Sequence, residues 1–266
     1  MSELFVHRFG VDGGAPLLAV HGVSAHGRRF APMAPVAFPA ADVFAPDLRG
    51  HGRSPADQPS TIERHVEDLL GVLDRADVDR AVVVGHSFGA AIATYLLAQA
   101  PDRVRCVVLL DPAMALPRSR AQEMSDGMLG SDVGYSSLDD LVAARGSGRS
   151  AAARTHSDAD TRLVAVEGAA GWKTPWDRDV VARAWEEMAR PMPTIPTPRP
   201  TLLVEATQAQ LVTDLQRDHL RSQLGDELTV VAVDLGHMLY WDDFAASCAL
   251  VRDFLTVHAP DTVDVK

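Results

Sequence analysis

The chain has 266 residues, of which 47% are hydrophobic and 23% are charged, a balance typical of a globular protein that buries a sizeable core. Its formal net charge of −11 argues against a nucleic-acid partner and against an anionic membrane surface, because both of these bind basic faces. No window approaches the roughly 20 consecutive apolar residues that a membrane-spanning helix needs.

Short apolar runs alternate with helical patterns in the first half of the chain. The runs at 17–21 (LLAVH), 42–46 (DVFAP), 80–85 (RAVVVG) and 104–111 (VRCVVLLD) are typical of buried strands. Helices are predicted to begin at Thr61, which opens a capping-box pattern, and to span 88–100, where Pro101 follows. This alternation predicts an α/β fold with a mostly parallel, doubly wound sheet.

The pattern changes between residues 114 and 198, where strand-like runs disappear. Helical segments are predicted at 138–145, 158–170 and 177–190, and a proline-rich stretch closes the region. Strand signals return at 201–205 (TLLVE) and 228–234 (LTVVAVD), and an amphipathic helix follows at 244–258. We therefore expect a core domain formed by residues 1–113 and 199–266, interrupted by a helical cap at 114–198.

The two cysteines carry no sign of a metal or redox site. Cys106 falls in a predicted strand and Cys248 in a predicted helix, and neither has C-x-x-C spacing. Both are expected to be small core residues in a reducing compartment. Because no secretory signal is evident at the N-terminus, we expect a cytoplasmic protein, either a monomer or a homodimer.

The strongest chemical signal is GHSFG at residues 85–89, which fits G-x-S-x-G. An apolar strand leads directly into it and a helix leads directly out. A sharp strand-to-helix turn holds its central residue, Ser87, in a strained backbone conformation above the sheet, and the glycines on either side give it room. The motif in this context predicts that Ser87 is a nucleophile.

Such a nucleophile needs hydrogen-bond donors for the oxyanion that its attack creates. The backbone N–H of Phe88, at the start of the helix, is one candidate. The loop after the first buried strand, HGVS at 21–24, supplies the second candidate in the N–H of Val23. His21 itself is expected to brace this loop.

The serine also needs a base, because a hydroxyl is a weak nucleophile at neutral pH. Among ten histidines, His237 follows the last apolar strand directly, and reacting groups in such sheets gather at the carboxyl ends of strands. His86 is expected to point away from the serine, and His51 belongs to a glycine-rich loop. Four further histidines lie in polar helical or loop contexts and are expected to be solvated: His65, His156, His219 and His258.

These motifs together resemble the α/β-hydrolase superfamily. The resemblance rests on HG at 21–22, DLRGHGRS at 47–54, GHSFG at 85–89 and GHMLYWDDF at 236–244. It is nearest to the capped, cofactor-independent serine hydrolases, which include esterases, carbon–carbon bond hydrolases, lactonases and haloperoxidase-like proteins. It implies the α/β-hydrolase fold, with a helical cap inserted after the sixth core strand. Ser87 argues against dehalogenase and epoxide hydrolase chemistry, since those relatives carry aspartate at this position.

The acid that would orient His237 departs from the family pattern. The family usually places it after the strand read here at 201–205, in a G-x-x-D arrangement, but this chain has ATQA at 206–209. Asp111, at the end of the preceding core strand, is the favoured replacement, although Asp-Pro is also a common turn. Glu205, another donor, or a dyad without this acid remain alternatives.

Pocket residues are predicted chiefly from the insert. Its tryptophans and methionines suit a moderately hydrophobic acyl or aryl substrate under a lid, and they equally suit the packing of a small cap. The candidates are Ser24, His86, Met114, Trp172, Trp176, Trp185 and Met238. The sequence shows no cluster of arginine or lysine that would indicate a phosphorylated or CoA-bearing substrate. The charged loop at 47–54 is expected to be structural.

The expected function is that of a carboxylesterase-like serine hydrolase. Ser87, His237 and Asp111 would cleave a small hydrophobic ester or related carbonyl substrate through an acyl-enzyme. Candidate ligand residues are scattered, so no metal or organic cofactor is expected. Two alternatives remain open. One is carbon–carbon bond hydrolysis or acyl transfer on the same triad, and the other is a non-catalytic small-molecule-binding protein.

Overall fold

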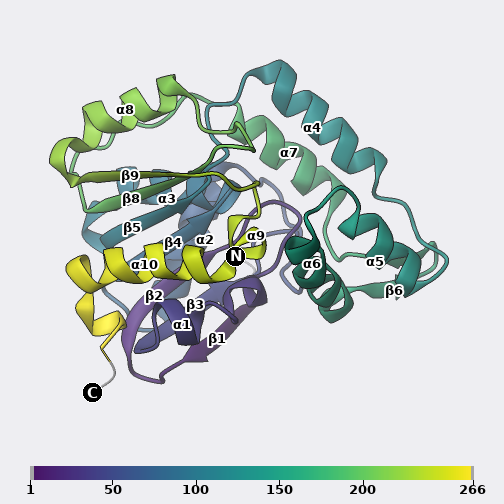
Figure 1. Ribbon diagram of the computed structural model, residues 1–266, viewed down its shortest axis with the longest axis horizontal. Coiled ribbons are helices and arrows are strands. Elements are labelled where there is room, and N and C mark those ends of the chain that lie inside the picture. Colours follow the sequence, from purple (N-terminus) through teal and green to yellow (C-terminus); the bar gives the residue numbers. More distant parts are fainter. Residues whose placement is uncertain (1–2, 265–266) are drawn as a thin grey trace.

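The computed structural model describes residues 3–264. A seven-stranded sheet runs through its centre in the order β1-β3-β2-β4-β5-β8-β9 (Figure 1). β1 pairs antiparallel with β3, and the other neighbouring strands pair in parallel. The strands are β1 (Val6–Gly10), β2 (Ala15–Val20), β3 (Ala41–Pro46), β4 (Ala81–His86), β5 (Val104–Leu110), β8 (Thr201–Ala206) and β9 (Leu228–Val233). The mostly parallel α/β sheet predicted from the alternation of elements is confirmed.

The apolar runs locate six of these strands to within two residues. All residues of β3 and β4 are buried, as expected for parallel strands that are covered on both faces. β1 was not predicted from the sequence, and its residues are only partly buried or exposed. An edge strand has a single neighbour, so it needs no continuous apolar run, and VHRFG offers none.

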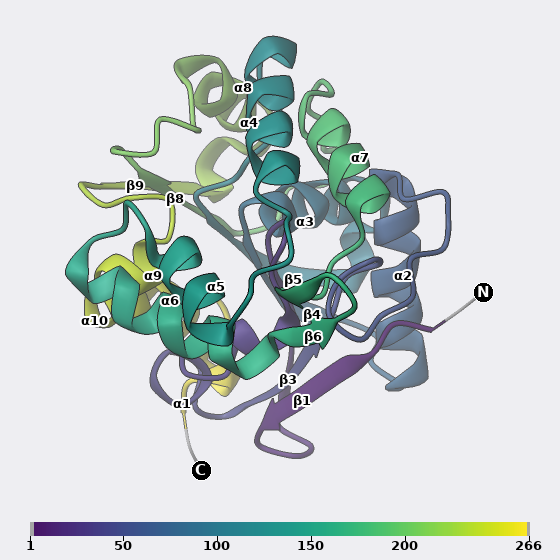
Figure 2. The same cartoon turned by 90° about the vertical axis from the view of Figure 1, so that its right-hand side faces the viewer.

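Helices cover both faces of the sheet (Figures 1 and 2). One apolar layer joins the sheet to α2 (Ile62–Arg75), α3 (Phe88–Gln99) and α8 (Asp214–Leu224), and the other joins it to α1 (Ala34–Ala37), α9 (Leu239–Asp242) and α10 (Phe244–His258). Alternate residues of β2 divide between the layers: Leu18 faces the first and Leu17 the second. Successive side chains of a strand point to opposite faces of the sheet, so β2 contributes to the apolar layer on each face.

Several helices begin where the local sequence satisfies their free N–H groups. The Thr61 side chain accepts a hydrogen bond from Arg64 N at 3.3 Å, so the predicted start of α2 is confirmed. Thr213 and Gln216 form a reciprocal capping box at the start of α8, and Asp243 caps α10. Cys106 and Cys248 are both buried and free, as expected of core residues.

The insert between β5 and β8 contains α4 (Arg118–Gly130), α5 (Leu138–Gly146), α6 (Ala151–Val164) and α7 (Arg178–Met188). These helices lie together beyond one end of the sheet, at the right of Figure 1. The insert follows the fifth strand of the chain and not a sixth. The expected count was wrong because the residues before β2 provide only one strand.

The insert also contains a short hairpin, although no strand was expected from its sequence. Its strands are β6 (Val166–Gly168) and β7 (Gly171–Lys173), which pair antiparallel. The helix expected at 158–170 therefore ends at Val164. Gly171 adopts a φ of +104° at the turn, a conformation that side chains rarely allow. Within residues 3–264, no helix is both long and apolar enough to cross a membrane.

Candidate active site

The turn between β4 and α3 places Ser87 at the carboxyl end of a central strand. Ser87 has φ 56° and ψ −119°, a strained conformation for a residue with a side chain. A Cβ on Gly85 would lie 2.5 Å from the Gly89 carbonyl oxygen, and one on Gly89 would lie 2.1 Å from the Val20 oxygen. Both glycines are thus required for the sharp turn that presents the serine.

Ser87, His237 and Asp111 form one hydrogen-bonded chain. The Ser87 hydroxyl oxygen lies 3.0 Å from His237 Nε2, and His237 Nδ1 lies 2.6 Å from Asp111 Oδ2. Since an ionised carboxylate only accepts, Nδ1 carries the proton and Nε2 is left to accept from the serine. These three residues come from the ends of β4, β5 and β9, so parallel strands bring them to the same edge of the sheet.

Asp111 is held more firmly than a simple turn residue would be. Its side chain is fully buried, and Oδ1 accepts the backbone N–H of Ala206 at 3.0 Å. The alternative acid, Glu205, instead pairs with Arg217 at 2.6 Å. Geometry therefore favours Asp111 over Glu205 as the partner of His237.

The HGVS loop passes close beside the serine. A Cβ on Gly22 would lie 2.9 Å from the Ser87 Cβ. His21 braces the loop as expected: its Nε2 accepts from Leu48 N at 2.8 Å, and its Nδ1 donates to the Gly22 carbonyl at 2.7 Å. Within residues 3–264, the N–H groups of Val23 and Phe88 donate no hydrogen bond to a protein atom. Two backbone donors beside Ser87 are thus available to a ligand.

His86 lies against the base and does not simply turn away from the site. Its ring centroid is 4.7 Å from that of His237, and its Nε2 donates to the His237 carbonyl at 2.9 Å. Its Nδ1 is then the acceptor facing the Tyr240 hydroxyl at 3.4 Å. Burial, and next the charge of His237, hold the pKa of His86 well below its usual range. A neutral His86 therefore supports the backbone and ring of His237.

Two further histidines, His65 and His51, have structural surroundings. His65 was expected to be solvated but is fully buried, with its ring 5.3 Å from that of Phe88. The expectation was wrong because this face of α2 packs against the start of α3. His51 accepts the Ser24 N–H at 3.0 Å and so supports the HGVS loop.

The charged loop after β3 is a structural junction. Asp47 accepts from the backbone N–H groups of Gly27 and Arg53, at 2.8 and 2.9 Å. The buried Arg49 forms a two-pronged pair with Asp68. These bonds tie the loop to its neighbours, in agreement with the structural role expected from the sequence.

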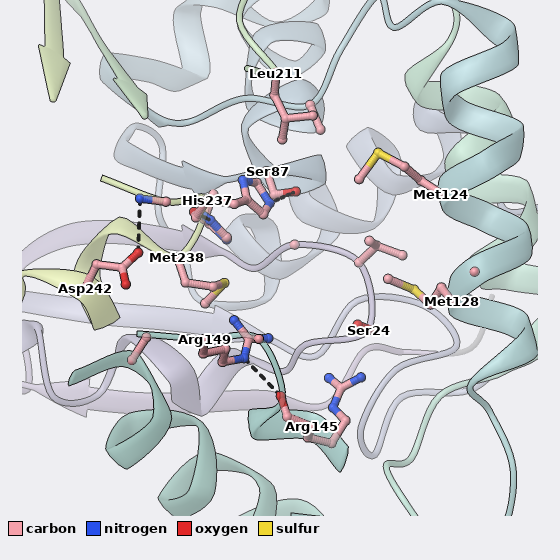
Figure 3. A pocket seen from close by; sticks show the side chains of 18 of the residues that line it. Ser24, Ser87, Met124, Met128, Arg145, Arg149, Leu211, His237, Met238 and Asp242 are labelled. Atoms are coloured by element: carbon pink, nitrogen blue, oxygen red, sulfur yellow. Dashed lines mark hydrogen bonds between the residues drawn. The ribbon is translucent and has the colours of Figure 1, made fainter. Parts of the chain in front are cut away.

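A cavity of about 590 Å³ opens above Ser87 and His237 (Figure 3). Of the predicted pocket residues, Ser24, His86, Trp185 and Met238 line it. Met114, Trp172 and Trp176 do not. Met114 and Trp176 are buried in the packing, whereas Trp172 pairs through its backbone with Tyr135. Met124 and Met128, on α4, form part of the wall instead.

Three arginines also line this cavity, and none of them was predicted as a pocket residue from the sequence. Arg29 comes from the short 3-10 helix Gly27–Phe30, Arg145 from α5, and Arg149 from the loop that follows α5. The expectation that no arginine cluster exists was wrong, because residues distant in the sequence converge here. The available signals were the RGSGR spacing at 145–149 and the arginine pair at 28–29.

Comparisons with known proteins agree with the fold described above. Residues 15–137 match the sequence model of the alpha/beta hydrolase fold. Lipase LipV of Mycobacterium tuberculosis is 38% identical over 243 residues, covering 89% of this chain and 92% of that protein. An E-2-(acetamidomethylene)succinate hydrolase shares the fold with a TM-score of 0.83 at 18% identity, over 95% of this chain and 94% of that one. A marine microorganism esterase does so with a TM-score of 0.79 at 19% identity, over 96% and 100%. The chain belongs to the α/β-hydrolase fold family.

Proposed function

We propose that this protein is a serine hydrolase that cleaves carboxylic esters, with Ser87 as nucleophile, His237 as base and Asp111 as the acid that orients it. The observation that carries the proposal is the continuous chain from the Ser87 hydroxyl through His237 to buried Asp111. The similarity to a lipase over nine-tenths of the chain supports the ester class.

The first half of the reaction acylates the enzyme. His237 Nε2 takes the hydroxyl proton as Ser87 Oγ attacks the ester carbonyl, and Asp111 stabilises the imidazolium that forms. The N–H groups of Val23 and Phe88 receive the oxyanion. Collapse of the tetrahedral intermediate breaks the bond to the alcohol oxygen, which takes the proton from His237.

The second half restores the enzyme. A water molecule gives a proton to His237 and attacks the acyl-serine carbonyl, and the same two N–H groups stabilise the second oxyanion. The acid product leaves as Ser87 regains its proton from His237. This cycle needs only the side chains and backbone groups already described.

The helical insert would act as the lid of this site. Residues 114–198 contribute Met124, Met128 and Trp185 to the cavity wall, while residues 1–113 and 199–266 supply the three reacting groups. The core would then carry out the chemistry, and the insert would largely determine which substrate is bound.

The test is hydrolysis of p-nitrophenyl esters, from acetate to octanoate, by the wild type and by Ser87→Ala. We expect turnover by the wild type and its loss in the variant. A fluorophosphonate probe should label the wild type and leave Ser87→Ala unlabelled.

Three outcomes would contradict the proposal in different ways. Labelling without ester turnover would favour carbon–carbon cleavage or another acyl transfer on the same triad. Neither labelling nor turnover would favour a non-catalytic binding protein. Turnover that survives in Ser87→Ala would remove the serine from the mechanism.

A further inference from the structure

The cavity above Ser87 contains more positive than negative charge, although the whole chain carries a net charge of −11. Arg29, Arg145 and Arg149 line it, and Asp242 is the acidic residue among its lining side chains in the described part of the chain. Asp160 lies behind Arg29. Charged groups are uncommon in a pocket that serves only for an apolar chain, so this cluster requires its own explanation.

The three arginines differ in whether a carboxylate pairs with them. Arg29 is paired with Asp160 at 2.6 Å, and Asp160 also accepts from His26 at 2.8 Å. Within residues 3–264, no carboxylate forms an ion pair with Arg145 or Arg149. Arg149 donates a hydrogen bond from Nε to the Arg145 carbonyl at 3.0 Å, and neither guanidinium group has a carboxylate from the described part of the chain in direct contact.

Partial burial makes the lack of a carboxylate partner costly, since both side chains are half-buried. The Trp241 ring, whose centroid lies 5.1 Å from the Arg149 guanidinium, offsets only part of this cost for Arg149. Burial, and then the charges of Arg29 and Arg149, lower the pKa of Arg145 to about 10. Arg145 stays charged at neutral pH, and an anion placed beside it would relieve both the repulsion and the lost hydration.

Figure 3 shows where such an anion would sit relative to the reacting groups. Arg145 and Arg149 lie on one side of the cavity, and Ser87 and His237 lie on the other. Methionines from α4 and the loop before α9 line the space around them. A substrate bound here would place its ester at the serine and an anionic end at the arginines, with an apolar segment between.

The charge balance selects the kind of anion. Three arginines face two aspartates, Asp160 and Asp242, and Asp242 is held by Gly236 N at 3.1 Å and the Ser150 hydroxyl at 2.6 Å. The excess is a single positive charge, which a carboxylate matches and a dianionic phosphate exceeds. The planar fork of a guanidinium also fits a carboxylate with two parallel hydrogen bonds.

We propose that Arg145 and Arg149 form a carboxylate-binding subsite, so that this hydrolase prefers esters that carry a free carboxylate at the end remote from the scissile bond. The inference rests on the proposed function, because it deepens the substrate class of the same site. It replaces a wholly hydrophobic substrate with an amphipathic, monoanionic one.

The experiment compares esters that differ only in this charge. Mono-4-nitrophenyl adipate and suberate are matched with the same esters capped by a methyl group, and 4-acetoxybenzoate with its methyl ester places the charge in the leaving group. The charge lies on the acyl group in the first series and on the leaving group in the second. In at least one of the two series, we expect kcat/KM of the charged ester to exceed that of its neutral partner by about 10- to 100-fold, which is the range of hydrogen bonds to charged groups.

Variants test whether the arginines cause this preference. Arg145→Gln and Arg149→Gln should each reduce the ratio of charged to neutral kcat/KM by about tenfold or more, mainly through KM. Arg154→Gln, an exposed arginine on α6 outside the cavity lining, is the matched control and should keep the wild-type ratio. A ratio near one in the wild type, or an unchanged ratio in Arg145→Gln, would overturn the subsite.

A binding measurement separates this inference from the proposed function. Calorimetry with Ser87→Ala should detect monomethyl adipate, which carries one carboxylate and one ester, binding more tightly than dimethyl adipate, and the added Arg145→Gln change should abolish the difference. If the two compounds bind equally, or monomethyl adipate does not bind, the subsite is wrong whatever the esterase activity. Selective binding of monomethyl adipate without any ester turnover would keep the subsite and overturn the esterase assignment.

Discussion

The sheet core and the helical insert of this protein differ in how much of their helices is buried. α3, beneath the nucleophile, buries ten of its twelve residues, whereas α4 buries only Ala121 and Ser125 of its 13. α6 buries three small side chains, Ala153, Ser157 and Thr161, of its 14 residues. The core around Ser87 therefore holds the reacting groups in fixed positions, while α4 and α6 cover the cavity with surfaces that packing constrains much less. Within the insert α7 differs, since it buries six of its 11 residues.

This difference teaches where substitutions matter for chemistry and where they matter for specificity. Close packing makes the core intolerant of even one added carbon. The insert has room for change, and it also supplies Arg145 and Arg149 to the cavity. A protein family can thus keep one mechanism and vary its substrate through the insert.

The largest expected effect concerns the acid in the core. Asp111→Asn should lower kcat for ester hydrolysis about 10⁴-fold, by analogy with triad acids elsewhere, because an amide no longer fixes the His237 tautomer. Glu205→Gln is the control: its carboxylate pairs with Arg217, so turnover should change by less than about threefold. An equal loss of kcat in Asp111→Asn and Glu205→Gln would argue that Asp111 only stabilises the fold and does not orient His237.

A glycine substitution in the core should have the next largest effect. The Cβ in Gly89→Ala would lie 2.1 Å from the Val20 oxygen, so the turn must shift. We expect the free energy of unfolding to fall by about 3 kcal/mol, with loss of activity. Chemical denaturation measures it, and an unchanged midpoint would show that the turn at Ser87 adapts more easily than the structure indicates.

Acid sensitivity should come partly from the buried His65. Burial, and then the charges of His51 and Arg49, lower the pKa of His65 to about 3, so the unfolded chain takes up a proton near its ordinary value while the folded chain does not. Stability should therefore fall as the pH drops below about 6.5.

The variant His65→Leu removes this contribution. Within residues 3–264 neither ring nitrogen has a hydrogen-bond partner, so the change should cost little at pH 7. Between pH 7 and pH 5 the variant should lose about 2 kcal/mol less stability than the wild type. Parallel stability curves for the two proteins would show that His65 takes up its proton normally in the folded state.

The smallest expected effect repeats the glycine substitution in the insert. A Cβ at Gly127, in α4, would meet nothing within 4 Å, and alanine favours helix more than glycine does. Gly127→Ala should raise the free energy of unfolding by about 0.5 to 1 kcal/mol. Since the same change at Gly89 should destabilise, opposite signs in thermal unfolding would sharpen the contrast between the two regions, and equal signs would break it.

The sequence alone predicted much of the core and its nucleophile. Buried parallel strands require continuous apolar runs, and β2, β3, β4, β5 and β8 were readable for that reason. GHSFG between a strand and a helix pointed to Ser87, and the placement of His237 after the last strand pointed to the base. Both signals are local, since each depends on the few residues that surround it.

Tertiary structure decided what no local pattern carries. Only the parallel alignment of β5 with its neighbours brings Asp111 to His237 and leaves Glu205 with Arg217. Only the folding of the insert over the sheet brings Arg145 and Arg149 into the cavity of Ser87. A strand or a tight turn is stabilised within a short stretch of sequence, whereas a pocket is made by residues whose separation in the chain says nothing about their distance in space.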